Sequence, residues 1–339
     1  MKKIVIIGGG FAGSYCAQHL EKRFAVTLID EKDYFEFTPS IIRTLIEPGY
    51  LFHIQIKHHQ YLSQTKIVIE KVKRLTSQEV HTANHIYPFD YLIISSGSGY
   101  AAPIKSSSIV INRAVELRQY AQRLVQAPSV VVLGGGIVGV ELAAEIIENY
   151  PHKDITVIHS RPQLMDRLHP GAGEKAKRFL EAKGVKIILN RRIKDFTEEF
   201  KDTPSLVFSC TGIFPHSQFL PPSFLENGRV KVNSHLQVLN HPSIFSAGDV
   251  NNLAEEKTAQ NAEAQAKIVV QNIICLEREK SLKEYLSRKR ILVISLGEKR
   301  GIICFRWFSL FGRTAAILKR LIQWKTMIKK NFIFFNFIP

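Results

Sequence analysis

The sequence predicts an α/β protein with two Rossmann-like domains. At 339 residues the chain is long enough for about two domains, each with its own core. Two glycine-rich segments, GGGFAG from Gly8 and GGGIVG from Gly134, each follow a short apolar strand and precede a helical stretch. One such segment is weak support, because glycine-rich turns match it by chance, but two copies in the same context are difficult to explain otherwise.

The first glycine loop lies inside one β-α-β unit. An apolar strand over residues 3–7 precedes the loop, a helical stretch follows through Leu20, and a second strand over residues 25–29 ends at Asp30. In such a unit the first glycine forms the turn, the second lets the backbone approach a pyrophosphate, and the third allows close helix packing. These positions are Gly8, Gly10 and Gly13, and Asp30 stands where a carboxylate holds a ribose hydroxyl.

The second unit departs from the first at the ribose position. Aligning the two units replaces Asp30 by His159, which is followed by Ser160 and Arg161. A carboxylate at this position would repel a 2′-phosphate, whereas His, Ser and Arg side chains can bind one. The sequence therefore predicts that NADPH is accepted at least as well as NADH.

Further small-residue turns follow apolar strands and permit close backbone approach to a dinucleotide. They are Ser95–Gly99, Cys210–Gly212 and the segment Ser246–Asp249. Breakers at Pro103, Pro128 and Pro221–Pro222 indicate the edges of an inserted middle domain. The predicted domains are residues 1–105 with 230–290, residues 106–229, and residues 291–339.

Cysteine spacing and hydropathy exclude several classes of protein. The four cysteines are scattered, so their spacing predicts no zinc site and no redox dithiol. No run reaches the roughly 18 apolar residues of a membrane-spanning helix, and the apolar run after Met1 is too short for a signal peptide. We expect a cytoplasmic protein without a metal site.

The C-terminal segment carries much of the excess charge of +16. Residues 301–339 contain no acidic residue, and basic side chains alternate with aromatic ones. Read as a helix after Gly312, the segment places one apolar face along Ile317, Leu321, Trp324 and Ile328. This composition predicts that residues 313–339 bind an anionic membrane surface, with Lys319, Arg320 and Lys330 elsewhere around the axis. The alternatives are that the segment docks as a helix on the rest of the protein or that it forms a dimer interface.

The motifs together resemble a known class of flavoproteins. GGGFAG, FDYLIISSGSG, GGGIVGVELAAEI, TVIHS, SCTG, FSAGDV and WKTM cover nearly the whole chain. The pattern resembles the type II NAD(P)H:quinone reductases and, within them, the apoptosis-inducing-factor-like group that includes ferroptosis suppressor proteins. Disulfide reductases of the same superfamily carry a C-x-x-x-x-C pair, which is missing here, so thiol chemistry is disfavoured.

The resemblance implies a glutathione-reductase-like fold with FAD at the first loop and NADPH or NADH at the second. Hydride passes from the nicotinamide to the flavin and then two electrons pass to a membrane quinone. The implied cofactor-binding positions are Gly8, Gly10, Phe11, Ala12, Gly13, Asp30, Glu31, Lys32, Thr38, Pro39, Val72, Ser96, Gly97, Gly134, Gly136, Ile137, Gly139, His159, Ser160, Arg161, Thr211, Gly212, Gly248, Asp249, Thr258 and Ala259.

Two further residues are implied to be catalytic. Lys257 falls where the family places the chain against the flavin ring, and a cation there would stabilise the reduced flavin. Glu141 falls in the first helical turn after the second loop, facing the nicotinamide and the flavin. A solvated lysine and a carboxylate that stabilises the helix N-terminus are the alternatives.

Two other functions stay open beside the quinone reductase. The resemblance to apoptosis-inducing factors allows a structural FAD and a basic surface that binds nucleic acid. Because the basic residues cluster with aromatic ones at one end of the chain, we expect lipid and no nucleic acid as partner. A reductase for a small redox protein would leave the aromatic segment unexplained, and a homodimer is left open.

Overall fold

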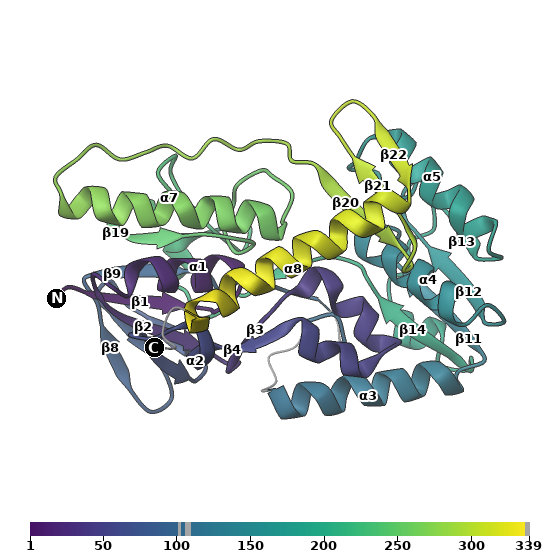
Figure 1. Ribbon diagram of the computed structural model, residues 1–339, viewed down its shortest axis with the longest axis horizontal. Helices are drawn as coiled ribbons and strands as arrows, with labels where there is room; N and C mark the ends of the chain where they lie inside the picture. Colours follow the sequence, from purple (N-terminus) through teal and green to yellow (C-terminus); the bar gives the residue numbers. More distant parts are fainter. Residues whose placement is uncertain (101–102, 106–109, 336–339) are drawn as a thin grey trace.

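Two sheets of mainly parallel strands and a long C-terminal helix form the framework of the molecule (Figure 1). The computed structural model describes residues 1–100, 103–105 and 110–335. The two sheets lie at opposite ends of the molecule, and the C-terminal helix crosses between them. The predicted α/β class with two Rossmann-like units is confirmed.

The first sheet has six strands in the order β18-β19-β9-β1-β2-β5. Their bounds are β1 Lys3–Ile7, β2 Ala25–Asp30, β5 Lys66–Ile69, β9 Tyr91–Ile94, β18 Gln237–Val238 and β19 His241–Ser246. Strands β1, β2, β5, β9 and β19 run parallel to their neighbours, and β18 is antiparallel. Because β18 and β19 come late in the chain, this sheet is assembled from two distant parts of the sequence.

Alternation along β1 explains how the first sheet is covered on both faces. Ile4 and Ile6 pack with helices α1 (Phe11–Leu20) and α7 (Ala259–Glu277), while Val5 and Ile7 face the opposite side. That side is covered by a small antiparallel sheet of β6 (Arg74–Leu75), β7 (Glu79–His81) and β8 (Ile86–Pro88). A strand buried on both faces reads as a continuous apolar run, as KIVII does.

The second sheet has four parallel strands in the order β13-β12-β11-β14. Their bounds are β11 Ser129–Leu133, β12 Asp154–Ile158, β13 Lys186–Ile188 and β14 Ser205–Ser209. Helices α3 (Val110–Gln126), α4 (Ile137–Asn149) and α5 (Pro170–Glu181) belong to the same unit. Each glycine loop thus ends a central strand and begins a helix, α1 or α4.

The C-terminal part forms an antiparallel sheet and one long helix. Strands β20 (Leu292–Leu296), β21 (Arg300–Cys304) and β22 (Ser309–Gly312) lead into α8 (Arg313–Phe335). Helix α8 packs on β20 and β21 and reaches α2 (His58–Tyr61) of the first unit. The expected helix after Gly312 is confirmed, and residues 336–339 of the predicted membrane segment lie outside the described residues. Within the described ranges, no helix combines the length and apolar character needed to cross a bilayer.

The remaining elements are short. They are β3 Tyr34–Glu36, η1 Thr38–Leu45, η2 Pro48–His53, β4 Gln55–Lys57, α2 His58–Tyr61, β10 Ser98–Gly99, α6 Phe196–Glu199, β15 Phe214–Pro215, η3 Pro222–Phe224, β16 Leu225–Glu226 and β17 Arg229–Val230. Helix α7 begins at Ala259 because the Thr258 hydroxyl caps it by accepting from Asn261 N at 3.2 Å.

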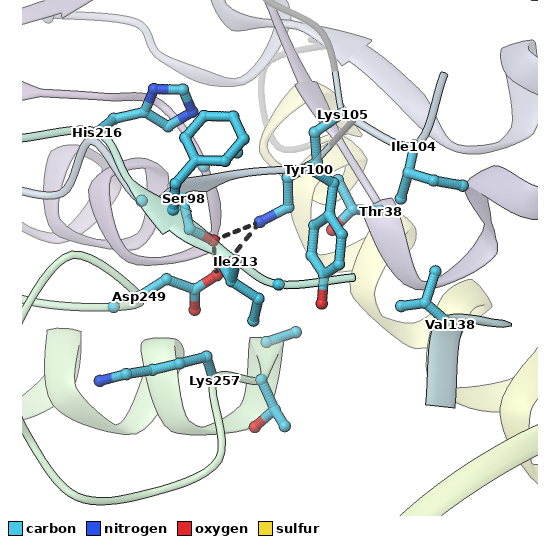
Figure 2. Close-up of a pocket in the computed structure, with 18 of the residues that line it drawn as sticks. Thr38, Ser98, Tyr100, Ile104, Lys105, Val138, Ile213, His216, Asp249 and Lys257 are labelled. Carbon is cyan, nitrogen blue, oxygen red and sulfur yellow. Dashed lines mark hydrogen bonds and ion pairs between the residues drawn. The ribbon is translucent and has the colours of Figure 1, made fainter. Parts of the chain in front are cut away.

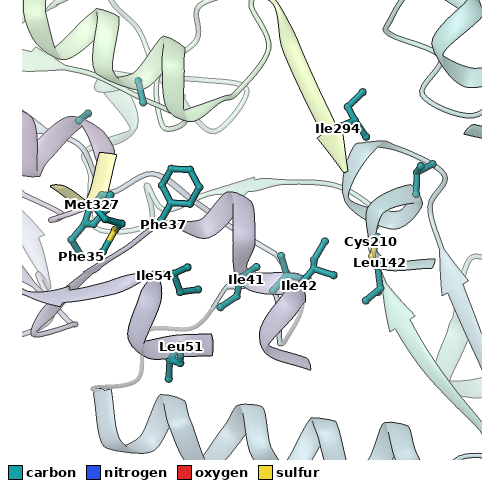
Figure 3. Packing of buried hydrophobic residues seen from close by; sticks show 14 of the residues in the cluster. Phe35, Phe37, Ile41, Ile42, Leu51, Ile54, Leu142, Cys210, Ile294 and Met327 are labelled. Carbon is teal, nitrogen blue, oxygen red and sulfur yellow. The ribbon is translucent and has the colours of Figure 1, made fainter. Parts of the chain in front are cut away.

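One apolar core connects all three parts of the molecule. It joins Phe35, Ile41 and Ile42 of the first unit to Leu142 of α4, Ile294 of β20 and Met327 of α8 (Figure 3). Each buried aliphatic or aromatic side chain of this size stabilises the fold by about 1.5–3 kcal/mol. The two units and α8 are therefore held together by packing. The predicted domain boundaries stay predictions.

Candidate functional site

The two glycine loops open onto one cavity of about 1770 Å³. Its volume exceeds the 300–1,000 Å³ of an ordinary small-molecule pocket. All of the predicted cofactor-binding and catalytic residues line it except Gly13 and Gly139. The cavity lies at the carboxyl ends of β1, β2, β11 and β12, where open α/β sheets bind their ligands.

The glycines of each loop have two different surroundings. A Cβ atom built on Gly10 or Gly136 meets nothing within 4 Å, so both positions leave backbone open toward the cavity. A Cβ on Gly13 would lie 1.8 Å from the Gly8 oxygen, and one on Gly139 the same distance from the Gly134 oxygen. Neither glycine lines the cavity, and both serve the close packing of helix on strand, so their contact with a cofactor stays a prediction.

Asp30 holds the first loop from the end of β2. Its Oδ2 accepts from the backbone N–H of Gly9, and its Oδ1 accepts from Lys32 N at 3.0 Å. The carboxylate also lines the cavity beside Glu31 and Lys32. Asp30 therefore orders the loop while keeping one edge available to a ribose.

His159 has the same structural role in the second loop. Its Nδ1 accepts from Gly135 N at 3.1 Å, and its Nε2 lies 3.5 Å from Asp166 Oδ1. The ring is buried. His159 lines the cavity, but its Nδ1 is occupied by the loop, so the expectation that it binds a 2′-phosphate stays a prediction.

A cluster of basic side chains that was not predicted from the sequence lies beside Arg161. Ser160 and Arg161 are exposed and line the cavity, as do Arg191, Arg192 and Lys194. Backbone bonds bring the two segments together, from Arg191 N to His159 O at 3.0 Å and from Asn190 N to Arg161 O at 3.2 Å. The signal was available, because β13 neighbours β12 and the residues after two neighbouring parallel strands meet at one sheet edge.

Asp249 lies in a polar group on the opposite side of the cavity. Its Oδ2 accepts from Ser98 Oγ at 2.6 Å and from Lys105 Nζ at 3.2 Å (Figure 2). The Lys105 ammonium also lies 5.4 Å from the ring centre of Tyr100. Ser98 and Lys105 were not predicted as site residues, and no local motif in the sequence marks Lys105.

Lys257 lies below Asp249 with its ammonium turned away from Lys105 (Figure 2). Its Nζ donates to the carbonyl oxygens of Asn251 and Leu253 at 2.9 and 3.1 Å. Burial, followed by the charge of Arg229, lowers the pKa of Lys257 to about 8. The side chain lines the cavity, but its charge is used to close the 251–257 loop.

Glu141 links the second unit to the C-terminal part of the chain. Its Oε1 accepts from Ser295 N of β20 at 2.7 Å and from Lys319 Nζ of α8 at 2.6 Å. The expected lipid contact of Lys319 is wrong, because its ammonium is committed to this buried carboxylate. One turn later on α4, Glu145 pairs with Arg43 at 2.9 Å.

Helix α8 has a docked face and an exposed face. Ala315, Gln323 and Met327 are buried, whereas the predicted apolar face is exposed except at Ile328, which is half-buried. The exposed fractions on that face are 56% for Ile317, 53% for Leu321 and 63% for Trp324. The docked-helix interpretation is confirmed for the buried face, and membrane binding by the exposed face stays a prediction. Ile322 and Thr326 of α8 line one side of the cavity.

The residues present fit two dinucleotides. Gly10 and Gly136 leave room for a phosphate, and the N-termini of α1 and α4 begin at these positions, where backbone N–H groups attract anions. Two such loops on one cavity define a flavin- and pyridine-nucleotide-dependent oxidoreductase. The chain belongs to the pyridine nucleotide-disulphide oxidoreductase family, whose model matches residues 2–266. FAD and NAD(P)H are its cofactors.

Relatives of similar length match over most of the chain. Apoptosis-inducing factor homolog B of Dictyostelium discoideum is 30% identical, with 89% of each chain covered. Ferroptosis suppressor protein 1 of Xenopus laevis is also 30% identical, covering 91% of this chain and 90% of that protein. The chain is therefore similar to these proteins along almost its whole length.

Solved structures share the fold at lower identity. NDH2 of Plasmodium falciparum in complex with NADH superposes with a TM-score of 0.81 at 15% identity, covering 98% of this chain and 97% of that one. The sulfide:quinone oxidoreductase of Aquifex aeolicus gives a TM-score of 0.80 at 20% identity, covering 98% and 92%. These likenesses show the fold.

Proposed function

We propose that this chain is an FAD-dependent NAD(P)H:quinone oxidoreductase that works at a membrane surface. The single observation that carries the proposal is the shared cavity, because both glycine loops and the inner side of α8 face it. FAD, when bound, accepts hydride from the nicotinamide and passes two electrons to the quinone. The protein supplies positioning and electrostatics for both half-reactions.

The first unit holds FAD through groups on two sides of the cavity. Gly10 leaves the space for the pyrophosphate, and Asp30 holds the adenosine ribose. Asp249 takes the ribityl end, where Lys105 partly neutralises its charge. Lys105 supplies the cavity-side cation that the sequence assigned to Lys257.

The second unit positions the nicotinamide dinucleotide. Gly136 and the start of α4 receive its pyrophosphate, and Arg161, Arg192 and Lys194 surround the end where a 2′-phosphate would lie. Arg161 and Lys194 are exposed and free to reorient toward an anion. This arrangement supports use of NADPH.

Glu141 stands where the two dinucleotides meet. Lys319 and Ser295 fix its carboxylate by three hydrogen bonds, so its position is set before any ligand arrives. A fixed, ion-paired carboxylate orients the reacting ring and repels a second anion. We therefore assign Glu141 an orienting role in hydride transfer, with Lys319 as its positioning partner.

The quinone and the membrane surface are both assigned to the part of the molecule around α8. A structural relative is named a sulfide:quinone oxidoreductase, so the fold carries quinone chemistry in another protein. On this chain, α8 lines the cavity with Ile322 and Thr326 and exposes Leu321 and Trp324 on its other side. A lipid-soluble acceptor would enter from the bilayer beside this helix.

A second apolar surface extends the membrane footprint beyond α8. The turn between β21 and β22 exposes Trp307 to 73% and Phe308 to 48%, and Arg306 stacks 4.4 Å from the Trp307 ring centre. Ile302 and Cys304 of the preceding strand are buried, so only the turn belongs to this surface. Aromatic and basic side chains of this kind favour the headgroup region.

The acceptor half-reaction tests the proposal. Purified protein is reduced anaerobically with NADPH and mixed with a water-soluble quinone or with a long-tailed quinone in anionic liposomes. We expect both quinones to reoxidise the flavin, the long-tailed one only when liposomes are present. Flavin that stays reduced with every quinone would overturn the assignment and favour a structural FAD of the apoptosis-inducing-factor kind.

A further inference from the structure

The last part of α8 enters the FAD unit through one buried lysine. Lys330 is 7% exposed, and its Nζ donates to Ser14 Oγ of α1 at 2.7 Å. The same ammonium lies 4.2 Å from the ring centre of Phe35 and 4.6 Å from that of Tyr61. Lys330 was expected to reach lipid, but its side chain points into the protein.

Beyond Lys330, a line of buried polar groups continues to the cofactor loop. The Tyr61 hydroxyl lies 2.6 Å from His58 Nδ1, and His58 Nε2 lies 3.9 Å from Asp30 Oδ2. His58 is fully buried and supports the loop from below, since a Cβ on Gly9 would come within 2.6 Å of its Nε2. One connected group of side chains therefore runs from the end of α8 to the carboxylate that holds the first loop.

A lysine in this position is costly unless it serves a purpose. Among the described residues, Lys330 forms no ion pair, and its desolvation is offset by Ser14, by two aromatic rings and by the more distant charge of Glu263. Burial lowers the pKa of Lys330 to about 7. An apolar residue would pack at lower cost, but it would not fix the helix to Ser14.

We propose that Lys330 is a positioning residue that couples docking of α8 to FAD binding at the first glycine loop. With Lys330 in place, Ser14, Tyr61 and His58 are held beneath Gly9 and Asp30. When the end of α8 is displaced, Ser14 and the ring of Tyr61 lose their partner and the support of the loop is loosened. Linkage makes the coupling reciprocal, so bound FAD also tightens docking of the helix.

The inference rests on FAD occupying the first loop and is independent of quinone and of NADPH. It assigns adjacent lysines of α8 opposite roles, because Lys329 is exposed whereas Lys330 is buried. Lys329 remains available to anionic lipid. The pair therefore provides a matched comparison.

The test compares Lys330→Met with Lys329→Met in the full-length protein. The readouts are the FAD dissociation constant, from quenching of FAD fluorescence, and hydrogen exchange of α8 with and without FAD. We expect Lys330→Met to weaken FAD binding roughly five- to tenfold, the low end of typical coupling, and to abolish the protection that FAD gives α8. Lys329→Met should leave both unchanged and weaken binding to anionic liposomes.

Ser14→Ala is the second variant, since it removes the acceptor without changing α8. It should weaken FAD binding in the same direction while thermal unfolding of the FAD-free protein still shows one folded state. Unchanged FAD affinity in both Lys330→Met and Ser14→Ala would overturn the proposal. So would a loss of liposome binding in Lys330→Met with FAD affinity intact, because Lys330 would then be a lipid contact.

Discussion

At the scale of single residues, neighbouring glycines in one loop perform different tasks. Gly10 leaves open space toward the cavity, whereas Gly13 is closed in by the Gly8 carbonyl. A side chain at Gly10 would fill the position of a phosphate without disturbing the fold. A side chain at Gly13 would separate α1 from β1.

The first prediction separates these two tasks. Gly10→Val should yield a folded protein that binds no FAD, and Gly13→Val should lower the free energy of unfolding by about 3 kcal/mol, the upper end for overpacked sites. Circular dichroism and urea unfolding report the fold, and flavin absorbance after dialysis reports the cofactor. FAD bound to folded Gly10→Val would show that the loop is not the pyrophosphate site.

Coenzyme choice belongs to the arginines at the edge of the second sheet. We predict that Arg161→Ala and Arg192→Ala each raise the Michaelis constant for NADPH roughly tenfold or more, since a charge-assisted contact contributes about 1.5–3 kcal/mol. The constant for NADH should change little. Lys201→Ala is the control, because Lys201 is basic and exposed but does not line the cavity. Equal effects on the two coenzymes would remove the 2′-phosphate from the explanation.

Acid sensitivity should originate at His58. Burial lowers the pKa of His58 from 6.5 to about 4, so the folded state binds fewer protons than the unfolded state between these values. Stability is therefore lost as the pH falls from about 6.5 toward 4, by up to ~3 kcal/mol. Urea unfolding across this range should show a smaller loss of stability in His58→Gln than in the control His59→Gln, because the ring of His59 is exposed. Identical losses would assign the sensitivity elsewhere.

At the scale of elements, α8 has one surface that the sequence predicts and one that it does not. The exposed face was predictable, because Ile317, Leu321 and Trp324 follow helical spacing. The docked face was not, because Lys319 and Lys330 read as solvent-facing until their partners Glu141 and Ser14 are in place. Partners distant in sequence leave no local pattern.

The second glycine unit gives the same lesson for a loop. Its strand, loop and helix were predictable from the spacing of apolar residues and glycines. The direction of the His159 side chain was not, because the competing acceptor role toward Gly135 N depends on three-dimensional geometry. The sequence located the residue in the site but not the hydrogen bond that its ring accepts from the loop.

Membrane attachment is a prediction about the exposed face of α8. The double variant Leu321→Ser, Trp324→Ser should weaken binding to anionic liposomes by roughly tenfold or more while FAD stays bound, because two large apolar side chains are lost from the interface. The change is sharper than truncation, which would also remove the Lys319–Glu141 pair. Leu286→Ser is the control, since Leu286 is 64% exposed outside this helix. Liposome binding that is unchanged in the double variant but lost with salt would leave only the basic residues as anchor.

At the scale of the whole molecule, three parts of the chain meet around one cavity. The first sheet, the second sheet and α8 each contribute lining residues, and a single apolar core fixes their arrangement. A donor and an acceptor held in one enclosed space can react without diffusing, which is the main contribution a cofactor-dependent protein makes.

Anaerobic titration of the bound FAD with NADPH tests this arrangement most directly. We predict complete bleaching of the flavin absorbance at one NADPH per FAD, and we predict that Gly136→Val keeps its FAD but is not bleached, because only the second loop is blocked. Flavin that stays oxidised in the unmodified protein with excess NADPH and with excess NADH would contradict a shared cavity for the two dinucleotides.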